Sequence, residues 1–215
     1  MRTKMMECSE CILGTACERR CVFLRSMYEP GHVFFHQGDV PEAIHFVSKG
    51  LVLLTRYDSD GRELSKHLRP TGALLDAQAA VGRPHNSTAV SVTSVNLCVL
   101  PLARFQAWLG PRTSPLRAVL ELALAEARSL ENSATMARRP ATERVAGFLL
   151  EHGGADDAPP LDLQHQLIAQ LLDLRPETFS RALARLRQEG AIEGHRTVRV
   201  IDRGRLASLA AEAEE

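Results

Sequence analysis

The sequence lacks long apolar runs and an excess of charge of either sign, and its first residues do not resemble a secretory leader. The longest strongly apolar runs, at 51–54 and 145–150, fall far short of the ~20 residues that cross a bilayer, so we expect no membrane-spanning helix. Lys plus Arg total 26 and Asp plus Glu total 26, so the overall charge points neither to nucleic acid nor to a membrane surface. Residues 1–10 carry charges but no apolar core, which favours a cytoplasmic protein whose thiols are reduced.

The sequence also lacks a His-x-His motif, although it holds eight histidines. Five of them lie in the first half of the chain. A cupin-like metal barrel also presents histidines from its strands, so a metal enzyme is one alternative. We expect instead that these five are surface or core residues and that the chain is not an enzyme. They are His32, His36, His45, His67 and His85.

Short apolar segments alternate with turn residues from about Glu29 to Pro101. Asp60-Gly61 stands between two of these segments and is a strong hairpin signal. This rhythm predicts an antiparallel barrel or sandwich, which we assign to a sensor domain over 22–110. The predicted strands are 33–35, 43–47, 51–57, 64–68, 89–92 and 97–100.

Residues 114–138 contain no Gly and only one Pro, at the start, and predict a long helix. Seven apolar positions step by alternating four and three residues, a seam that is typical of two helices packed along their length. We therefore expect 111–138 to form a dimerisation helix. The alternative is a helix that lies on its own barrel through Val119, Leu122 and Leu124. The seam positions are Leu116, Leu120, Ala123, Ala127, Leu130, Ala134 and Ala137.

The last part of the chain, 139–215, predicts a DNA-binding domain. A helix over 141–152 ends at two glycines, and helices over 164–172 and 176–188 are joined by only three residues, which indicates a helix-turn-helix. A short hairpin over 191–201 would make it a winged domain. The apolar face that packs the two helices comprises Leu167, Ile168, Leu171, Leu174, Phe179, Leu183 and Leu186.

Charge gathers locally in this domain, although the whole chain is neutral. Between Arg175 and Arg205 there are eight arginines and four acidic residues. Glu177, Ser180 and Arg181 lie within one turn of the second helix and could reach base edges in a major groove. Phosphate contacts are expected from Arg175, Arg185, Arg187, Arg196 and Arg199.

The order of these parts resembles the CRP/FNR family of bacterial transcription regulators over nearly the whole chain from Glu29 to Leu209. The most specific match is Pro176-Glu177-Thr178-Phe179-Ser180-Arg181, which is similar to the Glu-x-x-Ser-Arg recognition helix of the FNR branch. The resemblance implies an α+β fold: a cyclic-nucleotide-binding-like antiparallel β-roll, a long dimerisation helix and a C-terminal winged helix-turn-helix. It also implies a homodimer on a double-stranded DNA palindrome of TTGAT-type half-sites, with RNA polymerase as a further partner.

In that branch the matching residues read bases directly. The resemblance implies that Glu177 accepts a hydrogen bond from a cytosine amine and that Arg181 donates to guanine. Ser180 would contact a step that contains thymine.

Four of the five cysteines crowd into residues 1–21, where reduced thiols indicate metal or redox chemistry. The spacing Cys8-x2-Cys11-x5-Cys17 resembles the N-terminal cluster ligands of FNR, and Cys98 stands in a segment like the one that carries FNR's fourth ligand. The resemblance implies a four-iron, four-sulfur cluster that senses oxygen, nitric oxide or redox state. Cys21 is an alternative fourth ligand, for a cluster or for zinc, and a thiol redox switch is a third possibility.

Cyclic-nucleotide members of the family hold the ribose and the cyclic phosphate with a Glu and an Arg-Ser pair. The corresponding stretch, 72–89, contains neither of them. We therefore expect that cyclic AMP is not the effector, whereas a different small ligand in the β-roll is an alternative.

Overall fold

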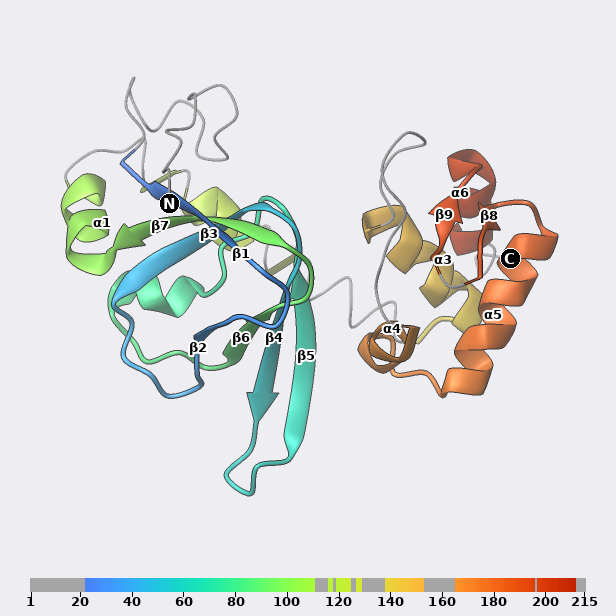
Figure 1. Ribbon diagram of the computed structural model, residues 1–215, viewed down its shortest axis with the longest axis horizontal. Helices are drawn as coiled ribbons and strands as arrows, with labels where there is room; N and C mark the ends of the chain where they lie inside the picture. The colour runs from blue at the N-terminus through green and yellow to red at the C-terminus, as the bar shows by residue number, and fades with distance from the viewer. Residues whose placement is uncertain are drawn as a thin grey trace. The chain divides into compact units, whose positions relative to one another are not determined.

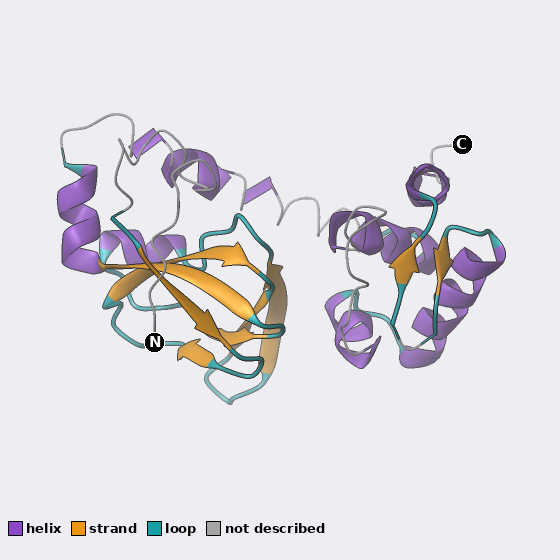
Figure 2. Cartoon of the chain, turned by 45° about the horizontal axis from the view of Figure 1, so that its top comes forward, coloured by secondary structure: helices purple, strands orange, loops and turns teal. Residues whose placement is uncertain are grey.

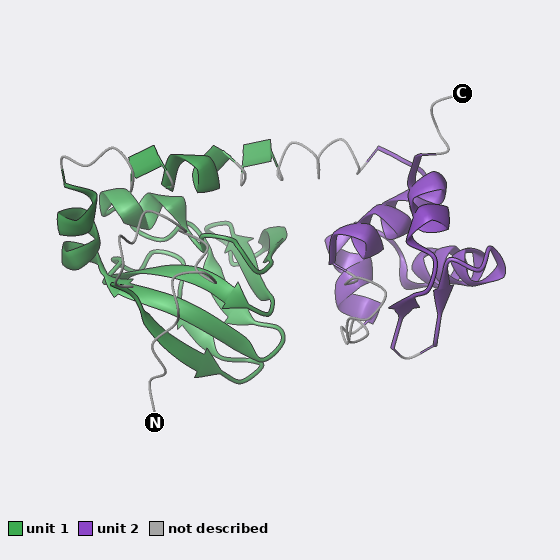
Figure 3. Cartoon of the chain, turned by 90° about the horizontal axis from the view of Figure 1, so that it is seen from above, with its two compact units in different colours: residues 1–128 green, residues 129–215 purple. Residues whose placement is uncertain are grey.

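The computed structural model of the chain describes residues 22–110, 116–117, 119–124, 127–128, 138–152, 165–195 and 197–211. The chain forms two compact units, Met1–Arg128 and Ser129–Glu215, coloured separately in Figure 3. The division falls inside the segment for which a long helix is predicted. Each unit has its own apolar core, as expected if the β-rich part and the helix-turn-helix fold as separate bodies.

The first unit contains two antiparallel sheets, as predicted (Figure 1). One sheet has the order β1-β7-β3 and the other the order β2-β6-β4-β5. A turn with Gly61 at φ +77° joins β4 to β5, which confirms the hairpin predicted at Asp60-Gly61. The strands are β1 (Leu24–Tyr28), β2 (Val33–Phe35), β3 (Ala43–Lys49), β4 (Val52–Tyr57), β5 (Glu63–Arg69), β6 (Thr88–Ser91) and β7 (Val95–Pro101).

Three elements of this unit were not predicted: β1, the 3-10 helix η3 (Ala77–Val81) and helix α1 (Leu102–Leu109). Strand β1 has no inward apolar stripe, because its large apolar side chains Leu24 and Met27 are 57% and 63% exposed. It forms through main-chain pairing with β7, a long-range contact that apolar periodicity does not reveal.

The sheet β1-β7-β3 is covered on both faces (Figure 2). Because successive side chains of a strand point to opposite faces, Val47 and Leu97 pack against the second sheet, whereas Phe46 and Cys98 lie on the other side. On that side η3 and α1 contact β3. Its buried cluster, called the helix-side cluster below, comprises Phe23, Ile44, Phe46, Leu74, Ala79, Cys98, Leu100 and Phe105.

Residues 116–117, 119–124 and 127–128 are helical, as predicted. Val119 and Leu122 pack against the helix-side cluster, which the alternative with a barrel-docked helix anticipated. The opposite side is open: Leu116 and Leu120 are 58% and 56% exposed in the single chain. That alternative also placed Leu124 on the barrel. This part of the prediction is wrong, because Leu124 is 49% exposed.

The predicted dimer seam is therefore only partly visible. Leu116, Leu120 and Ala127 are exposed and Ala123 is half-buried. Leu130, Ala134 and Ala137 lie outside the described residues.

The second unit is a winged helix-turn-helix, with the three predicted helices α3 (Ala141–His152), α4 (His165–Leu171) and α5 (Pro176–Gln188). Strands β8 (Ile192–Glu193) and β9 (Arg199–Val200) form the hairpin. A further helix, α6 (Arg203–Ala211), was not predicted, and it packs against α3. Within the described parts of both units, no helix is long and apolar enough to cross a membrane.

The turn between α4 and α5 depends on Asp173, whose φ of +49° is left-handed. Asp tolerates this conformation better than most residues with a side chain. The turn lets the Leu174 amide donate to the Ala169 carbonyl at 2.8 Å. The predicted apolar face is confirmed: Ile168, Phe179, Leu183 and Leu186 are buried, and Leu167, Leu171 and Leu174 are half-buried.

Gly50, between β3 and β4, offers a test of the β-roll. Its φ is +96°, and a Cβ there would overlap the Ser94 carbonyl oxygen. Gly61 also has a positive φ, but nothing lies within 4 Å of a Cβ there. Gly61→Ala should therefore cost only the conformational penalty of about 1–2 kcal/mol. Gly50→Ala should cost at least about 2 kcal/mol more, because the backbone of β7 must also shift.

The measurement is urea unfolding followed by tryptophan fluorescence. Trp108 is the only tryptophan, and it packs on Phe23 and Phe105 in the first unit, so its signal reports that unit. Equal losses for the two variants would contradict the proposed steric role of the Gly50 turn.

Candidate nucleic-acid interface and sensor core

Helix α5 brings the three predicted base-reading residues to one exposed face. Its N-terminal position holds Pro176, and Glu177 lies in the first turn, where a negative charge is favoured. Ser180 and Arg181 follow three and four positions later and are exposed, as is Glu177. The Arg181 Nε donates to the Glu177 carbonyl oxygen at 3.4 Å. The opposite face is buried in the domain core, so α5 can present only this face to a partner.

The predicted phosphate contacts differ in their surroundings. Arg175 precedes α5 and is exposed, and Arg185 is exposed near its C-terminal end. Arg187 is half-buried, and its Nε donates to the Gly194 carbonyl oxygen in the hairpin turn at 2.6 Å. Arg199 lies 3.7 Å from Glu193 on the paired strand. Arg196 lies outside the described residues. The sequence therefore predicted that these arginines lie in one basic region, but it did not predict that Arg187 is half-buried and bonded to the hairpin turn.

The dimensions of α5 suit a DNA groove. Thirteen residues make a helix about 20 Å long, and an α-helix with its side chains is about as wide as the major groove of B-DNA. The exposed face of α5 therefore has dimensions that a major groove can accommodate.

The interior of the β-roll holds a buried, hydrogen-bonded pair of polar side chains. His85 is 4% exposed, and its Nδ1 lies 2.8 Å from Asp76 Oδ2. The other carboxylate oxygen of Asp76 accepts from the Gln78 amide at 2.9 Å and so caps η3. The His85 ring stacks on Phe35, with centroids 3.6 Å apart and planes within 7°. A stacked, hydrogen-bonded imidazole thus fills the space between η3 and strand β2.

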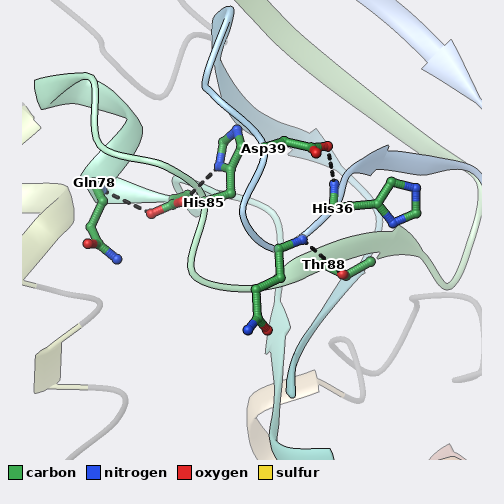
Figure 4. A network of polar contacts seen from close by, with 7 residues as sticks. His36, Asp39, Gln78, His85 and Thr88 are labelled. Carbon is green, nitrogen blue, oxygen red and sulfur yellow. Dashed lines mark hydrogen bonds and ion pairs between the residues drawn. The ribbon is translucent and has the colours of Figure 1, made fainter. Parts of the chain in front are cut away.

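Main-chain hydrogen bonds of the same histidine join it to the loop 36–39, and Figure 4 shows the side-chain contacts of this region. The His85 amide donates to the Asp39 carbonyl oxygen at 2.9 Å, and its own carbonyl oxygen accepts from the Gly38 amide at 2.7 Å. Asp39 Oδ2 accepts from the His36 amide at 2.8 Å, and the Gln37 amide donates to Thr88 Oγ1 at 3.1 Å. The loop 36–39 is thereby hydrogen-bonded to the chain around His85.

This geometry does not fit a cyclic nucleotide. The stretch 72–89 has no Glu and no Arg-Ser pair, and its one arginine, Arg83, is exposed. The buried polar groups of Asp76 and His85 are already bonded to each other. They are therefore not available to hold a ribose or a phosphate.

Among the described residues, the five histidines of this unit belong to no group that could hold a metal ion. Nowhere in the described residues does a group of three or more His, Cys, Asp or Glu side chains lie together in a way that could hold a metal ion. His45 lies on β3, and its ring centroid is 5.9 Å from that of Phe35. Burial, and then the nearby His85, lowers the pKa of His45 to about 4. His45 is therefore a half-buried residue that is neutral at physiological pH.

Cys98 lies in the helix-side cluster and is 8% exposed. It is paired with Arg25 on one side and with Phe46 on the other in the sheet. Phe23, in the same cluster, makes an edge contact with Phe46 at 5.1 Å. The predicted ligands Cys8, Cys11, Cys17 and Cys21 lie outside the described residues.

Sequence reasoning missed the pairing of Asp76 with His85. Neither residue stood in a recognisable motif, and they are nine positions apart. The local sequence indicates only the ends of η3: Asp76 precedes this helix, and Gly82, at φ +71°, follows it.

Comparison with known proteins matches both units. The Crp-like helix-turn-helix domain family matches residues 143–209, and the cyclic nucleotide-binding domain family matches residues 25–110. The nitrogen fixation regulation protein FixK from Bradyrhizobium diazoefficiens is 31% identical over 196 residues, which are 87% of this chain and 82% of that protein. The cyclic AMP receptor protein from Thermus thermophilus is 30% identical over 193 residues, which are 87% of this chain and 88% of that protein.

A solved structure shares the fold. The structure of FixK2 from Bradyrhizobium japonicum superposes with a TM-score of 0.74 and 24% identity, and the match covers 87% of this chain and 97% of that one.

The lowered pKa of His45 predicts that acid weakens the β-roll. Above pH 6.5 the imidazole is neutral in both folded and unfolded chains, so it adds no pH dependence. Between pH 6.5 and about 4 only the unfolded chain takes up the proton, so stability falls as the pH falls. The slope from this group reaches about 1.4 kcal/mol per pH unit, and the total loss is about 3 kcal/mol.

His45→Gln should remove this part of the slope, measured by urea unfolding with Trp108 fluorescence from pH 7.5 to 4.5. His67, whose pKa is lowered by burial and by Arg69, is the comparison, and His67→Gln should flatten the profile less. An unchanged acid slope in His45→Gln would show that burial does not hold His45 neutral.

Proposed function

Because the chain belongs to the CRP/FNR family of transcriptional regulators, we propose that it is a homodimeric, redox-responsive member that binds a palindrome of TTGAT-type half-sites. As a member of this family the protein is a DNA-binding transcriptional regulator and not an enzyme. The observation that carries the proposed specificity is the exposed face of α5, which presents Glu177, Ser180 and Arg181 together.

The chemistry of these three side chains suits a TTGAT-type half-site. The Arg181 guanidinium can donate to both acceptors of guanine in the major groove, and a Glu177 carboxylate oxygen can accept from the cytosine amine. Ser180 lies between them in the sequence and can contact an adjacent thymine-containing step. Since the Arg181 Nε is directed to the Glu177 backbone, its terminal nitrogens are the donors left for a base.

The proposed dimer uses the exposed side of the helix over 116–124. Leu116, Leu120 and Leu124 are each about half exposed or more in the single chain, which is unusual for large apolar residues that repeat every four positions. Regulators of this family bind DNA and act as dimers. A second copy of the helix would cover these leucines and place two α5 helices about one DNA turn, ~34 Å, apart. RNA polymerase is the further partner that we propose for the bound dimer.

The proposed redox response rests on the cysteines. Thiolates are the ligands that iron-sulfur clusters use, so Cys8, Cys11, Cys17 and Cys98 form a suitable donor set, and such a cluster would supply sensitivity to oxidants. The position of Cys98 supports this choice. Phe23 lies in the same cluster as Cys98. Cys17 is only six residues before Phe23, so the chain from Cys17 to Phe23 spans at most ~21 Å. A cluster or zinc with Cys21, and a thiol switch, are the alternatives that the test below separates.

DNA recognition is tested by fluorescence anisotropy on a duplex with two inverted TTGAT half-sites. Arg181→Ala should weaken binding by about 10-fold or more and remove the preference for guanine at its position, since a bidentate base contact is worth about 1–3 kcal/mol. Glu177→Gln should relax selectivity at the opposed cytosine with a smaller loss of affinity.

Gln188→Ala is the matched control, because Gln188 is exposed at the other end of α5 and should leave specificity unchanged. Leu120→Glu should sediment as a monomer and bind the palindrome no better than a single half-site. Wild-type protein that binds the TTGAT palindrome no better than a scrambled duplex would contradict the proposed specificity.

The cluster is tested on protein purified without air, by iron and sulfide analysis and visible absorption. Wild type and Cys21→Ser should be brown and contain iron and sulfide, whereas Cys98→Ser should be colourless and bind the palindrome more weakly. The reverse result for the two variants would assign Cys21 as the fourth ligand. Zinc alone would favour the structural alternative. Colourless, metal-free wild type with full DNA affinity would contradict both metal hypotheses.

A further inference from the structure

The wing of the second unit is a very short hairpin whose two strands, β8 and β9, have two residues each. Only two residue pairs join them, Ile192 with Val200 and Glu193 with Arg199. A two-residue ladder is too short to hold its own orientation, so the placement of the wing depends on contacts with the rest of the domain.

The base of the wing is well fixed by the domain core. Ile192 and Val200 are buried, and the Ala191 amide donates to the Leu186 carbonyl oxygen of α5 at 3.0 Å. The Ile201 amide in turn donates to the Ala191 carbonyl oxygen at 3.0 Å. These bonds anchor the ends of the hairpin but do not reach its turn.

The turn itself closes tightly at Gly194. Its φ is +85°, and a Cβ there would overlap the Thr197 carbonyl oxygen. The next residue, His195, is exposed. The conformation of the turn therefore depends on how Gly194 is held.

Gly194 is held by Arg187. The Arg187 Nε donates to the Gly194 carbonyl oxygen at 2.6 Å, a short bond between a cation and a backbone acceptor. Arg187 is half-buried, unlike Arg185 two positions earlier. The Arg187 charge also adds to burial in lowering the pKa of His165, at the start of α4. The hydrogen bond of the Arg187 side chain therefore joins α5 to the hairpin turn.

We infer that Arg187 is a positioning residue: it holds the wing turn against α5, in place of the phosphate contact expected from the sequence. The Nε bond to Gly194 orients the turn, and the turn presents the exposed wing to DNA. Arg185, exposed on the same helix, is the arginine that we assign to a phosphate.

Two substitutions separate the hydrogen bond from the charge. Gln carries its amide nitrogen after the same three side-chain carbons as the Arg Nε, so Arg187→Gln keeps a donor for Gly194 and removes the charge. Met has a similar length and no donor, so Arg187→Met removes both. Arg185→Gln removes a charge that we expect to face phosphate.

The measurement is the dissociation constant for DNA between 50 and 300 mM salt, on the TTGAT palindrome and on a scrambled duplex of equal length. Each phosphate contact contributes about 0.9 to the slope of log affinity against log salt, so a dimer that loses one per protomer loses about 1.8. Because scrambled DNA also reports the slope, the test stands even if the TTGAT proposal fails.

A positioning role predicts near wild-type affinity and slope for Arg187→Gln. Arg187→Met should bind about tenfold more weakly with an unchanged slope, and Arg185→Gln should lose slope. Hydrogen exchange of the wing peptide, 191–201, should speed up in Arg187→Met and not in Arg187→Gln. If Arg187→Met does not fold, Arg187→Gln still decides through its slope. A loss of about 1.8 in the slope of Arg187→Gln, or wild-type affinity and exchange in Arg187→Met, would overturn the inference.

Discussion

The burial of the sheet β1-β7-β3 on both faces is the constraint on which the first unit depends. Alternate residues of β3 and β7 must satisfy two different apolar environments: Val47 and Leu97 meet the second sheet, and Phe46 and Cys98 meet the helices. This division separates the chemistry of the unit. His45 and His85 contact Phe35, on the side that faces the second sheet. Cys98 lies on the other side, in the cluster that also contains Phe23 and against which Val119 and Leu122 pack.

In the second unit, the equivalent constraint is the packing of α5. Burying Phe179, Leu183 and Leu186 fixes the rotation of the helix about its axis, and this rotation alone exposes Glu177, Ser180 and Arg181 together. The left-handed Asp173 turn sets the distance to α4. Core packing therefore determines which residues of α5 are presented to a partner.

Sequence reasoning succeeded where the signal is local and periodic. The helix-turn-helix, its buried face and six strands of the β-roll all follow from apolar spacing and turn residues. It failed where a structure depends on distant partners. Strand β1 exists through its pairing with β7, and the Asp76–His85 pair belongs to a cluster in which His85 also stacks on the distant Phe35. The sequence does not distinguish Arg187 from Arg185. Only the folded hairpin shows that Arg187 is the one that bonds to Gly194.

The alternation of β7 also restricts how this protein can evolve. Exchanging one apolar residue for another in the strand changes volume, and neighbouring side chains can repack around it. Deleting or inserting a single residue would instead transfer Cys98 to the sheet-facing side and send Leu97 or Val99 among the helices. Variation in length should therefore accumulate in the turns of related proteins, whereas β7 keeps its residue count even when its composition drifts.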